Sequence, residues 1–401
     1  MRRTLLILFV LTIMVLSLGN FEKRLGSSLN NSVHAGGRAA ALDAVTASFS
    51  APTYEVNEGA QKLDVTVTLS SPAPNAMSVD YETAADVILQ PCVEVSGIGS
   101  ERCDFTTTLG TLRFGAGEQS KTFSLFVTDD SYVEGAETFT VSLSSPTGGV
   151  QLATQPTAIV TITDNDSAAG APNPVDEPLF FVRQHYIDFL NRSGEQAGVD
   201  SWVNQLTICG DSLTCNRVAV SSAFFGSQEF MLKGDFVFRA YQVCLNEHPN
   251  YREFTRDSQR VTGATAEAVW AARDAYMHEW MSYPEFKSRY DSLSNHDYVL
   301  KLEEGAKGPV SNESSLIDAL DKGTMNRESV AYNIVESPEV KSRLYNEAFV
   351  MMEYWGYLRR DPEPAGYQAW LGYLNENPDR YREMVRGFVD SVEYRMRFGK
   401  S

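Results

Sequence analysis

Four groups of acidic residues in the N-terminal half of the chain stand where strand-like apolar runs end. They are Glu58, Asp104, the run Asp129-Asp130-Ser131-Tyr132-Val133-Glu134-Gly135-Ala136-Glu137, and Asp164-Asn165-Asp166. One sheet domain could bring these groups to a single end, where the carboxylates would repel one another unless a hard cation neutralised them. Calcium takes about six to eight oxygen ligands of this kind, so the pattern predicts a calcium site.

The segments that must position these groups alternate apolar and polar residues, as half-buried strands do. About seven such strands over roughly 120 residues are typical of an immunoglobulin-like antiparallel β-sandwich, which we predict for residues 46–166. The clearest strands are Leu63–Leu69, Gly110–Phe114, Lys121–Val127, Glu137–Leu143 and Ala158–Thr163.

Residues 46–166 also resemble a Calx-beta domain. The resemblance rests on Glu58-Gly59, Asp104-Phe105 before Gly110-Thr111-Leu112, Phe114 with Gly117-Glu118, the spaced acids from Asp129 to Glu137, and Asp164-Asn165-Asp166. In calcium-binding members of that family, acids at these positions ligate ions at one end of the sandwich. The resemblance therefore implies these ligands: Glu58, Asp104, Asp129, Asp130, Glu134, Glu137, Asp164 and Asp166.

Two features depart from the family's pattern. Asn165 stands where calcium-binding members often have a third aspartate, and an insert lies between Asp86 and Cys103. Either departure could weaken or remodel the site.

The N-terminus has the pattern of an export signal. Met1-Arg2-Arg3 precedes an apolar run from Leu5 to Leu18, so we predict a signal peptide at residues 1–19. An uncleaved anchor is the alternative, because Lys23 and Arg24 flank the run, although the run is short for a full membrane span. Residues 20–45 then form a flexible leader, and the remaining chain is extracytoplasmic: secreted, at the cell surface or in the periplasm.

The cysteines fit that compartment. Cys92 and Cys103 bracket one glycine-containing loop, and Cys209 and Cys215 bracket another, so both pairs are predicted disulfides. Zinc is the alternative, but no closely spaced cysteine pair or histidine cluster accompanies them. Cys244 is left over at an apolar repeat position, where a buried free thiol is expected.

The charge balance points away from nucleic acid. The chain of 401 residues has 52 acidic and 34 basic side chains, a net charge of −18. No basic stripe is present to displace the counterions of a phosphate backbone.

Beyond a Pro- and Gly-containing linker at residues 167–178, the chain is helical and repeats itself. The pattern Phe181-Val182-x-x-x-Tyr186-x-x-x-Leu190 returns from Phe236 and from Phe349, with a fainter copy at Tyr298-Val299. Each copy is accompanied by a serine before an acid, a helix-start signal. The acids are Glu229, Glu285, Glu339 and Glu393, so we predict an all-α helical repeat domain of four units of about 55 residues over 179–398.

The outer units resemble a domain of unknown function, DUF4214, found in exported bacterial proteins. The matching residues are Leu190-Asn191-Arg192, Ala197-Gly198 and Trp202 in the first unit, and Leu358-Arg359-Arg360-Asp361-Pro362, Ala365-Gly366 and Trp370 in the last. The resemblance implies a helical module and carries no catalytic residue. Trp202 and Trp370 could stack on a sugar ring, but equivalent repeat positions favour core anchors.

No catalytic constellation emerges from the sequence. His278-Glu279 begins like a zinc-protease motif, but Ser282 stands where its second histidine belongs. Asp361 and Glu363 could be imagined as a glycosidase pair, yet they lie in a repeated interhelical turn. We therefore predict no enzyme.

The sequence as a whole predicts an exported, non-enzymatic, calcium-binding protein of the surface or envelope with a binding or adhesion-type role. Its cofactor is calcium, and its partner is an unknown glycan or an envelope or extracellular protein. No nucleic acid is expected, and a membrane only if the N-terminal signal is retained as an anchor. The alternatives are a metal-free structural spacer and an envelope enzyme acting on polysaccharide.

Overall fold

The computed structural model describes residues 44–84, 92, 95–167, 171–208, 213–263 and 265–400, with residues 213–216 and 228 described by their backbone alone. The predicted signal and nearly all of the predicted leader lie outside the described residues. So does Cys209, and the side chain of Cys215 is not described, so the second predicted disulfide stays a prediction. Within the described residues, no helix is long and apolar enough to cross a membrane.

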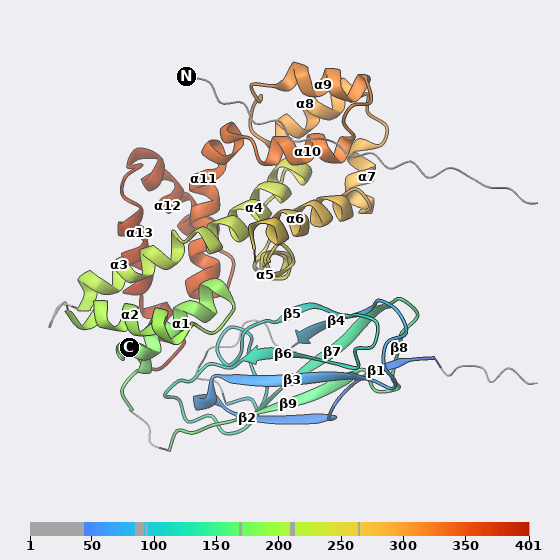
Figure 1. The fold of residues 1–401 in the computed structure, drawn as a ribbon. Coiled ribbons are helices and arrows are strands. Elements are labelled where there is room, and N and C mark those ends of the chain that lie inside the picture. Colours follow the sequence, from blue (N-terminus) through green and yellow to red (C-terminus); the bar gives the residue numbers. More distant parts are fainter. Residues whose placement is uncertain are drawn as a thin grey trace, which may run out of the picture. The chain divides into compact units, whose positions relative to one another are not determined.

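Among the described residues, nine strands form two sheets that pack as a β-sandwich, which confirms the predicted fold class (Figure 1). One sheet has the order β6-β3-β1-β8 and the other the order β2-β9-β7-β4-β5. The strands are β1 (Thr46–Phe49), β2 (Thr53–Asn57), β3 (Lys62–Leu69), β4 (Met77–Ala84), β5 (Leu109–Phe114), β6 (Ser120–Phe126), β7 (Glu137–Thr147), β8 (Gln151–Leu152) and β9 (Thr157–Thr163).

The sandwich is not antiparallel throughout. The first strand-like stretch is divided, so that β1 joins one sheet and β2 the other. As a result β1 pairs in parallel with β8, and β2 in parallel with β9, while the other paired strands are antiparallel. The division lets one stretch of chain contribute a strand to each sheet, and it places Glu58 directly after β2.

Alternating side chains fill the space between the sheets, as the sequence pattern requires. In β3, Val65, Val67 and Leu69 are buried, with polar residues between them. Phe105 stacks on Phe139 with ring centroids 4.0 Å apart, and both rings are buried. Phe105 directly follows Asp104 in the chain, so its packing in the core fixes the position of one of the acidic segments.

A disulfide joins Cys92 to Cys103, as predicted, and Cys103 is buried. Disulfides of this kind persist in oxidising compartments. The bridge ends one residue before Asp104, so it also constrains the approach to the acidic end. Cys244 is a free, buried cysteine, as predicted, and burial raises the pKa of its thiol to about 12.

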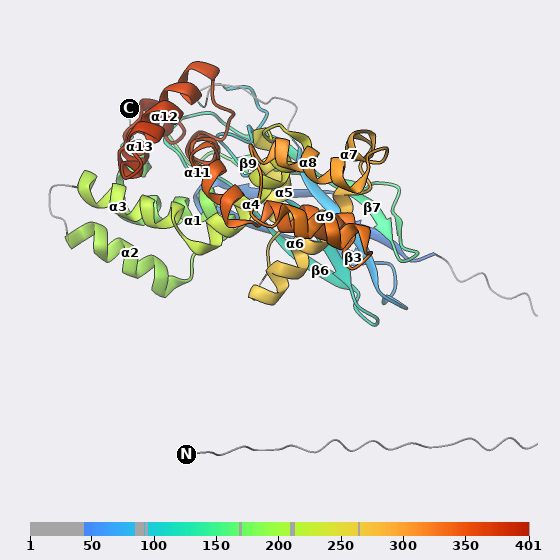
Figure 2. The same ribbon diagram turned by 90° about the horizontal axis from the view of Figure 1, so that it is seen from above.

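The rest of the described chain is helical and contains its own apolar core. The helices α1, α2 and α3 pack against one another (Figure 2). The elements are the short 3-10 helix η2 (Pro174–Asp176), α1 (Pro178–Leu190), α2 (Gln196–Ile208), α3 (Leu213–Phe225), α4 (Gln228–Leu245), α5 (Tyr251–Arg260), α6 (Ala266–Trp280), α7 (Pro284–Tyr290), α8 (Asn295–Gly305), α9 (Glu313–Asp321), α10 (Arg327–Val335), α11 (Pro338–Glu353), the π-helical turn η3 (Tyr354–Leu358), α12 (Pro364–Glu376), α13 (Tyr381–Val389) and α14 (Val392–Arg395).

The repeated apolar pattern lies inside this core. Its phenylalanines, tyrosines and leucines on α1, α4 and the α11–η3 segment are all buried, as the i, i+4 spacing predicts. Trp202 and Trp370 are half-buried and pack against Phe224 and Phe388 of equivalent units. Both tryptophans therefore act as anchors of the helical core.

Three of the four predicted serine caps are present. Ser227, Ser337 and Ser391 each accept a hydrogen bond from the backbone N–H three residues later. The fourth prediction, Ser282, is wrong, because α7 begins at Pro284 with Tyr283 as its N-cap. The inserted Tyr283 moves the serine one residue too far from the helix, and proline supplies the start instead.

The linker is held by contacts at its C-terminal end, contrary to the freedom its Pro and Gly content suggests. Asn173 caps η2 by accepting from the N–H of Val175, and Val175 is buried. Asp176 forms an ion pair with Arg395, with 2.7 Å between Oδ1 and Nη1. The local composition says nothing of these partners, because they lie more than 200 residues away in the chain.

Candidate metal site

The acidic residues predicted from the sequence meet at one end of the sandwich. Glu58 lies in the turn η1 (Glu58–Ala60) that follows β2, and Asp104 lies between the disulfide and Phe105. The loop from Asp129 to the first residue of β7, Glu137, connects β6 to β7, and Asp164 follows β9 directly. Thr128 donates its N–H to the carbonyl of Asp104, which ties two of these segments together.

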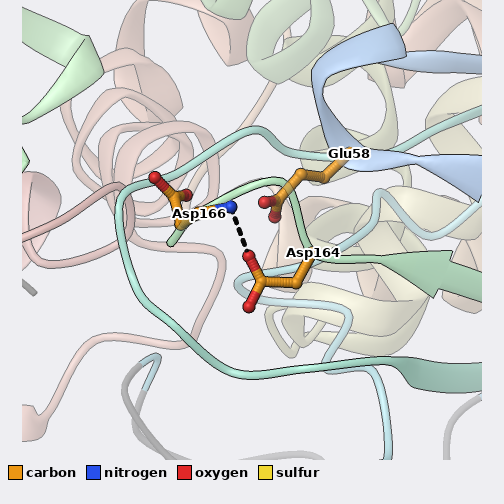
Figure 3. A group of neighbouring side chains, drawn as sticks. All are labelled: Glu58, Asp164 and Asp166. Atoms are coloured by element: carbon orange, nitrogen blue, oxygen red, sulfur yellow. Dashed lines mark hydrogen bonds between the residues drawn. The ribbon is translucent and has the colours of Figure 1, made fainter. Parts of the chain in front are cut away.

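Glu58, Asp164 and Asp166 form the first group (Figure 3). One carboxylate oxygen of each lies within 4.8 Å of the others, close enough for all three to ligate one ion. Asp164 is held by three backbone donors: the N–H groups of Glu134 and Gly135 reach its Oδ2, and that of Asp166 reaches its Oδ1. These bonds fix the direction of the Asp164 carboxylate and join the β6–β7 loop to the end of β9.

Asp104, Glu134 and Glu137 form the second group, again with one oxygen of each within 4.8 Å of the others. All three are buried, and a side-chain hydrogen bond joins Asp104 to Glu137. Two ionised carboxylates cannot share such a bond, so one of the pair holds a proton when no cation is present. A bound cation would replace that proton.

Asp130 lies beside both groups. Its carboxylate is close enough to Glu134, Glu58 and Asp104 for their charges to act on it, and it is only 5% exposed. Its Oδ1 accepts the N–H of Tyr132, but its buried Oδ2 has no hydrogen-bond partner among the described residues. Asp166 Oδ2 is likewise buried without a partner there. A buried carboxylate oxygen without a hydrogen-bond partner destabilises the fold unless something binds it. These two oxygens therefore suit a cation-binding site.

Burial and mutual repulsion give these carboxyls unusual proton affinities. Burial, together with neighbouring carboxylates, raises the pKa of Glu58 to about 8, of Asp130 to about 9 and of Glu134 to about 8. Burial and the charge of Asp104 raise the pKa of Glu137 to about 10. Burial also raises the pKa of Asp104, and burial and the charge of Asp166 raise that of Asp129. The site without a cation therefore favours protonated, neutral carboxyls.

Asp164 is the exception. Burial alone would raise its pKa, but the backbone donors of Gly135, Asp166 and Glu134 outweigh that effect and hold the pKa below its ordinary value. Asp164 therefore stays ionised and provides a fixed negative charge for an incoming cation.

Asn165, one of the two departures from the family pattern, supports the site as a donor. Its N–H reaches Glu58 Oε1 at 3.0 Å, and its Nδ2 reaches Asp129 Oδ1 at 2.9 Å. Asn165 therefore orients two carboxylates of the predicted ligand set, those of Glu58 and Asp129. Sequence reasoning missed this role, because the residue type alone suggests a lost ligand. The other departure is the insert between Asp86 and Cys103. Most of its first part, within residues 85–91, 93 and 94, lies outside the residues that the structure describes.

The helical residues weighed as catalytic have structural partners. Asp361 Oδ1 accepts from the indole of Trp355 at 2.9 Å and from the N–H of Tyr251 at 2.7 Å. Glu363 pairs with Arg360. His278 is exposed and pairs with Glu328 across its ring nitrogen Nδ1. Each of these residues therefore has a structural role. Asp361 joins a turn to the start of α5, Glu363 pairs within that turn, and His278 forms a surface pair.

A buried histidine and serine lie in the helical core. His185 Nε2 is 2.7 Å from Ser221 Oγ, which in turn contacts the hydroxyl of Tyr357. All three residues are fully buried, and burial lowers the pKa of His185 to about 4. Aromatic rings enclose the imidazole, including those of Phe181 and Phe224. Within the described part of the chain, the pair satisfies polar groups of the core and is not exposed at the surface.

A cavity of about 430 Å³ is lined by residues of the sandwich and of helices α1, α4 and α5. Its lining includes Tyr81, Tyr251, Arg192, Lys233 and Arg359. Arg192 and Lys233 both pair with Glu229, and Arg359 pairs with Asp188. These three cations are therefore already paired with carboxylates of the chain.

Comparison with known proteins agrees with both resemblances and with their order. Residues 41–166 match the Calx-beta domain family, and residues 341–398 match DUF4214, a domain of unknown function. The second match covers the last predicted unit, so the resemblance of residues 179–340 stays a prediction.

Relatives share the sandwich segment. The sodium/calcium exchanger Calx of Drosophila melanogaster is 32% identical over 136 residues, which are 34% of this chain and 13% of the exchanger. Adhesion G-protein coupled receptor V1 of Danio rerio is 35% identical over 81 residues, 20% of this chain and 1% of the receptor. Among solved structures, the apo-form CBD1 domain of Calx is 30% identical, with a TM-score of 0.26, and covers 31% of this chain and 100% of that one. The calcium binding domain CBD12 of CALX1.1 is 31% identical, with a TM-score of 0.26, and covers 31% and 47%.

Proposed function

We propose that this chain binds calcium at the acidic end of its sandwich, since residues 41–166 match the Calx-beta domain family. The observation that supports this most is the buried Asp130 carboxylate between two groups of acids, whose Oδ2 has no hydrogen-bond partner among the described residues. Two groups of three carboxylates suit two neighbouring ions, with Asp130 near both.

The chemistry of the ligand set favours calcium over other metals. Every candidate ligand is a carboxylate oxygen, which suits a hard cation and gives no nitrogen or sulfur for zinc or copper. Calcium accepts irregular shells of about six to eight oxygens, whereas magnesium demands a compact octahedron. Loops from four parts of the chain, each fixed by its own backbone bonds, supply an irregular shell more easily than an octahedral one.

We further propose that the protein acts outside the cytoplasm as a non-enzymatic binding or adhesion-type protein of the surface or envelope. The disulfide supports an oxidising compartment, and the signal-like N-terminus supports export. Its partner would be a glycan or an envelope or extracellular protein. A metal-free spacer and a polysaccharide-acting enzyme are the alternatives, and the measurements below separate the metal-free spacer from calcium binding.

Thermal unfolding with and without calcium tests the proposed site. Saturating calcium should raise the melting temperature of the purified chain by several degrees, since a ligand at about 100 times its Kd stabilises by about 2.7 kcal/mol. Excess magnesium should do much less. In Glu137→Gln, which removes one buried ligand, the calcium-induced shift should largely disappear.

Glu55→Gln is the matched control, because Glu55 is an exposed residue of β2 outside both groups. Its calcium-induced shift should equal that of the wild type. If the wild type melts at the same temperature in calcium and in chelator, the sandwich is a spacer.

The proton affinities predict how stability depends on pH. The folded-state pKa values of Glu58, Asp130, Glu134 and Glu137 are raised, so between about pH 5 and 8 the folded chain holds protons that the unfolded chain has released. Stability without calcium should therefore fall as the pH rises, by about 1.4 kcal/mol per pH unit for each proton held. Asp164, with a lowered pKa, acts only below this window.

Saturating calcium should abolish most of this slope, because the cation replaces the protons. Denaturant unfolding at pH 5, 6.5 and 8, each with calcium and with chelator, measures how the free energy of unfolding changes with pH. A chain whose calcium-free stability rises from pH 5 to 8 would contradict the proposed environment of these carboxyls.

A further inference from the structure

The loop that carries Asp130 and Glu134 is hydrogen-bonded to the C-terminal tail, defined here as residues 395–400. The N–H of Ser131 donates to the carbonyl of Phe398 at 3.0 Å, and the Ser131 hydroxyl donates to the same oxygen at 3.3 Å. The hydroxyl of Tyr132 donates to the carbonyl of Met396 at 3.0 Å. Ser131 and Tyr132 stand between the two acids, so the tail fixes the backbone from which both carboxylates project.

The tail approaches the loop very closely. Gly399 has a φ of +153°, and a Cβ at this position would overlap the Ser131 hydroxyl and lie 3.3 Å from the Asn173 amide. Asn173 in turn donates to the carbonyl of Arg395 at 2.9 Å. The tail is therefore held between the linker and the acidic loop, with no room for a side chain at residue 399.

A second route joins the helical region to the segment around Asp104. Arg359 donates to the carbonyl of Phe105 at 3.0 Å and to the hydroxyl of Thr106 at 2.8 Å. Arg397 of the tail donates to the carbonyl of Arg102 at 3.3 Å. Both guanidiniums are buried and pair with the carboxylate of Asp188. Asp104 is thus flanked on both sides by residues that the helical region holds.

These contacts lead us to propose that the C-terminal tail positions the calcium ligands, so that calcium binding and docking of the tail strengthen each other. The proposal rests on the proposed calcium site and names its regulation. A tail that holds the loop in its binding geometry removes part of the ordering that calcium would otherwise have to impose. Thermodynamic linkage then requires calcium to stabilise tail docking by the same factor.

Tyr132→Phe tests the proposal without touching a carboxylate. It removes the hydroxyl bonded to Met396 and leaves the ring, so calorimetric titration of the full chain should give a calcium affinity about two- to tenfold weaker. Gly399→Ala, which displaces the tail from Ser131, should weaken it at least as much. Tyr373→Phe is the control, because this hydroxyl pairs with Glu383 on the helical region and should leave calcium affinity unchanged.

Hydrogen exchange gives the reciprocal measurement. In the wild type, saturating calcium should slow exchange of the amides in residues 395–400 about two- to tenfold, the same factor by which losing the tail contact weakens calcium. Wild-type calcium affinity in both tail variants, with tail exchange indifferent to calcium, would overturn the coupling and leave the calcium site standing. A wild type that binds no calcium at all would overturn the proposed function and the coupling together.

Discussion

Replacing Asp130 by Asn should raise the melting temperature of the calcium-free protein and, at the same time, remove most of its response to calcium. Asn keeps an oxygen to accept the N–H of Tyr132, so the loop geometry is preserved. It removes a carboxyl that the folded chain must keep protonated near pH 7.5, because burial and Glu134 raise its pKa to about 9. Holding that proton costs the folded state on the order of a few kcal/mol, a cost that Asn does not carry. A neutral amide is a poorer calcium ligand, so calcium affinity should fall about a hundredfold or more.

Thermal unfolding in chelator and in calcium measures both effects on one sample. Asp80→Asn is the matched control, because Asp80 lies on β4 and accepts from Thr111 away from both acidic groups. This control should change neither the calcium-free melting temperature nor the calcium response by more than a degree or two. If Asp130→Asn destabilises the calcium-free protein instead, Asp130 has a structural role that the unpartnered oxygen does not explain.

Replacing Asp188 by Asn should destabilise the protein by about 3–5 kcal/mol, the cost of breaking a buried ion pair on one side. The Asp188 carboxylate is fully buried and accepts from Arg359 at 2.9 Å and from Arg397 at 3.0 Å. Both guanidiniums are buried as well. Loss of the charge would leave two buried guanidiniums uncompensated, with Arg359 also strained by a left-handed backbone at φ 49°.

Urea unfolding with tryptophan fluorescence measures this loss, since Trp355 lies in the η3 turn and Arg359 is the C-cap of that turn. Asp200→Asn on the exposed surface of α2 is the control and should change the free energy of unfolding by less than about 0.5 kcal/mol. Equal stabilities of Asp188→Asn and Asp200→Asn would mean that the three charges are not the anchor of the helical region.

The acidic end of the sandwich could be predicted because its signals are local. Each strand shows its own alternation, and each acid stands where an apolar run stops, so the fold follows from short stretches of sequence. The repeated helices were equally readable: Asn191, Asn246 and Arg359 occupy one repeat position, and all three end a helical segment with a left-handed residue. Asparagine tolerates that conformation, whereas Arg359 adopts it while bonded to Asp188 and Phe105.

What the sequence did not predict depends on partners far apart in the chain. Arg359 and Asp188 are 171 residues apart, and Ser131 and Phe398 are 267 residues apart, with no spacing pattern to connect them. Six of the eight predicted acids form two sets of three, Asp130 lies beside both sets, and Asp129 belongs to neither. This grouping is likewise a matter of side-chain geometry. The error at the start of α7 has a local cause instead. One inserted residue, Tyr283, moved the helix cap away from the predicted serine.

Calorimetric titration of the purified wild-type chain with calcium tests the central claim most directly. We expect saturable binding of two ions, with Kd values between about 10⁻⁶ and 10⁻³ M and protons released on binding near neutral pH. The released protons should appear as a dependence of the heat on the buffer, because the raised pKa values leave carboxyls to be deprotonated by the cation. A flat titration at millimolar calcium, in every buffer, would contradict the account and make the sandwich a metal-free spacer.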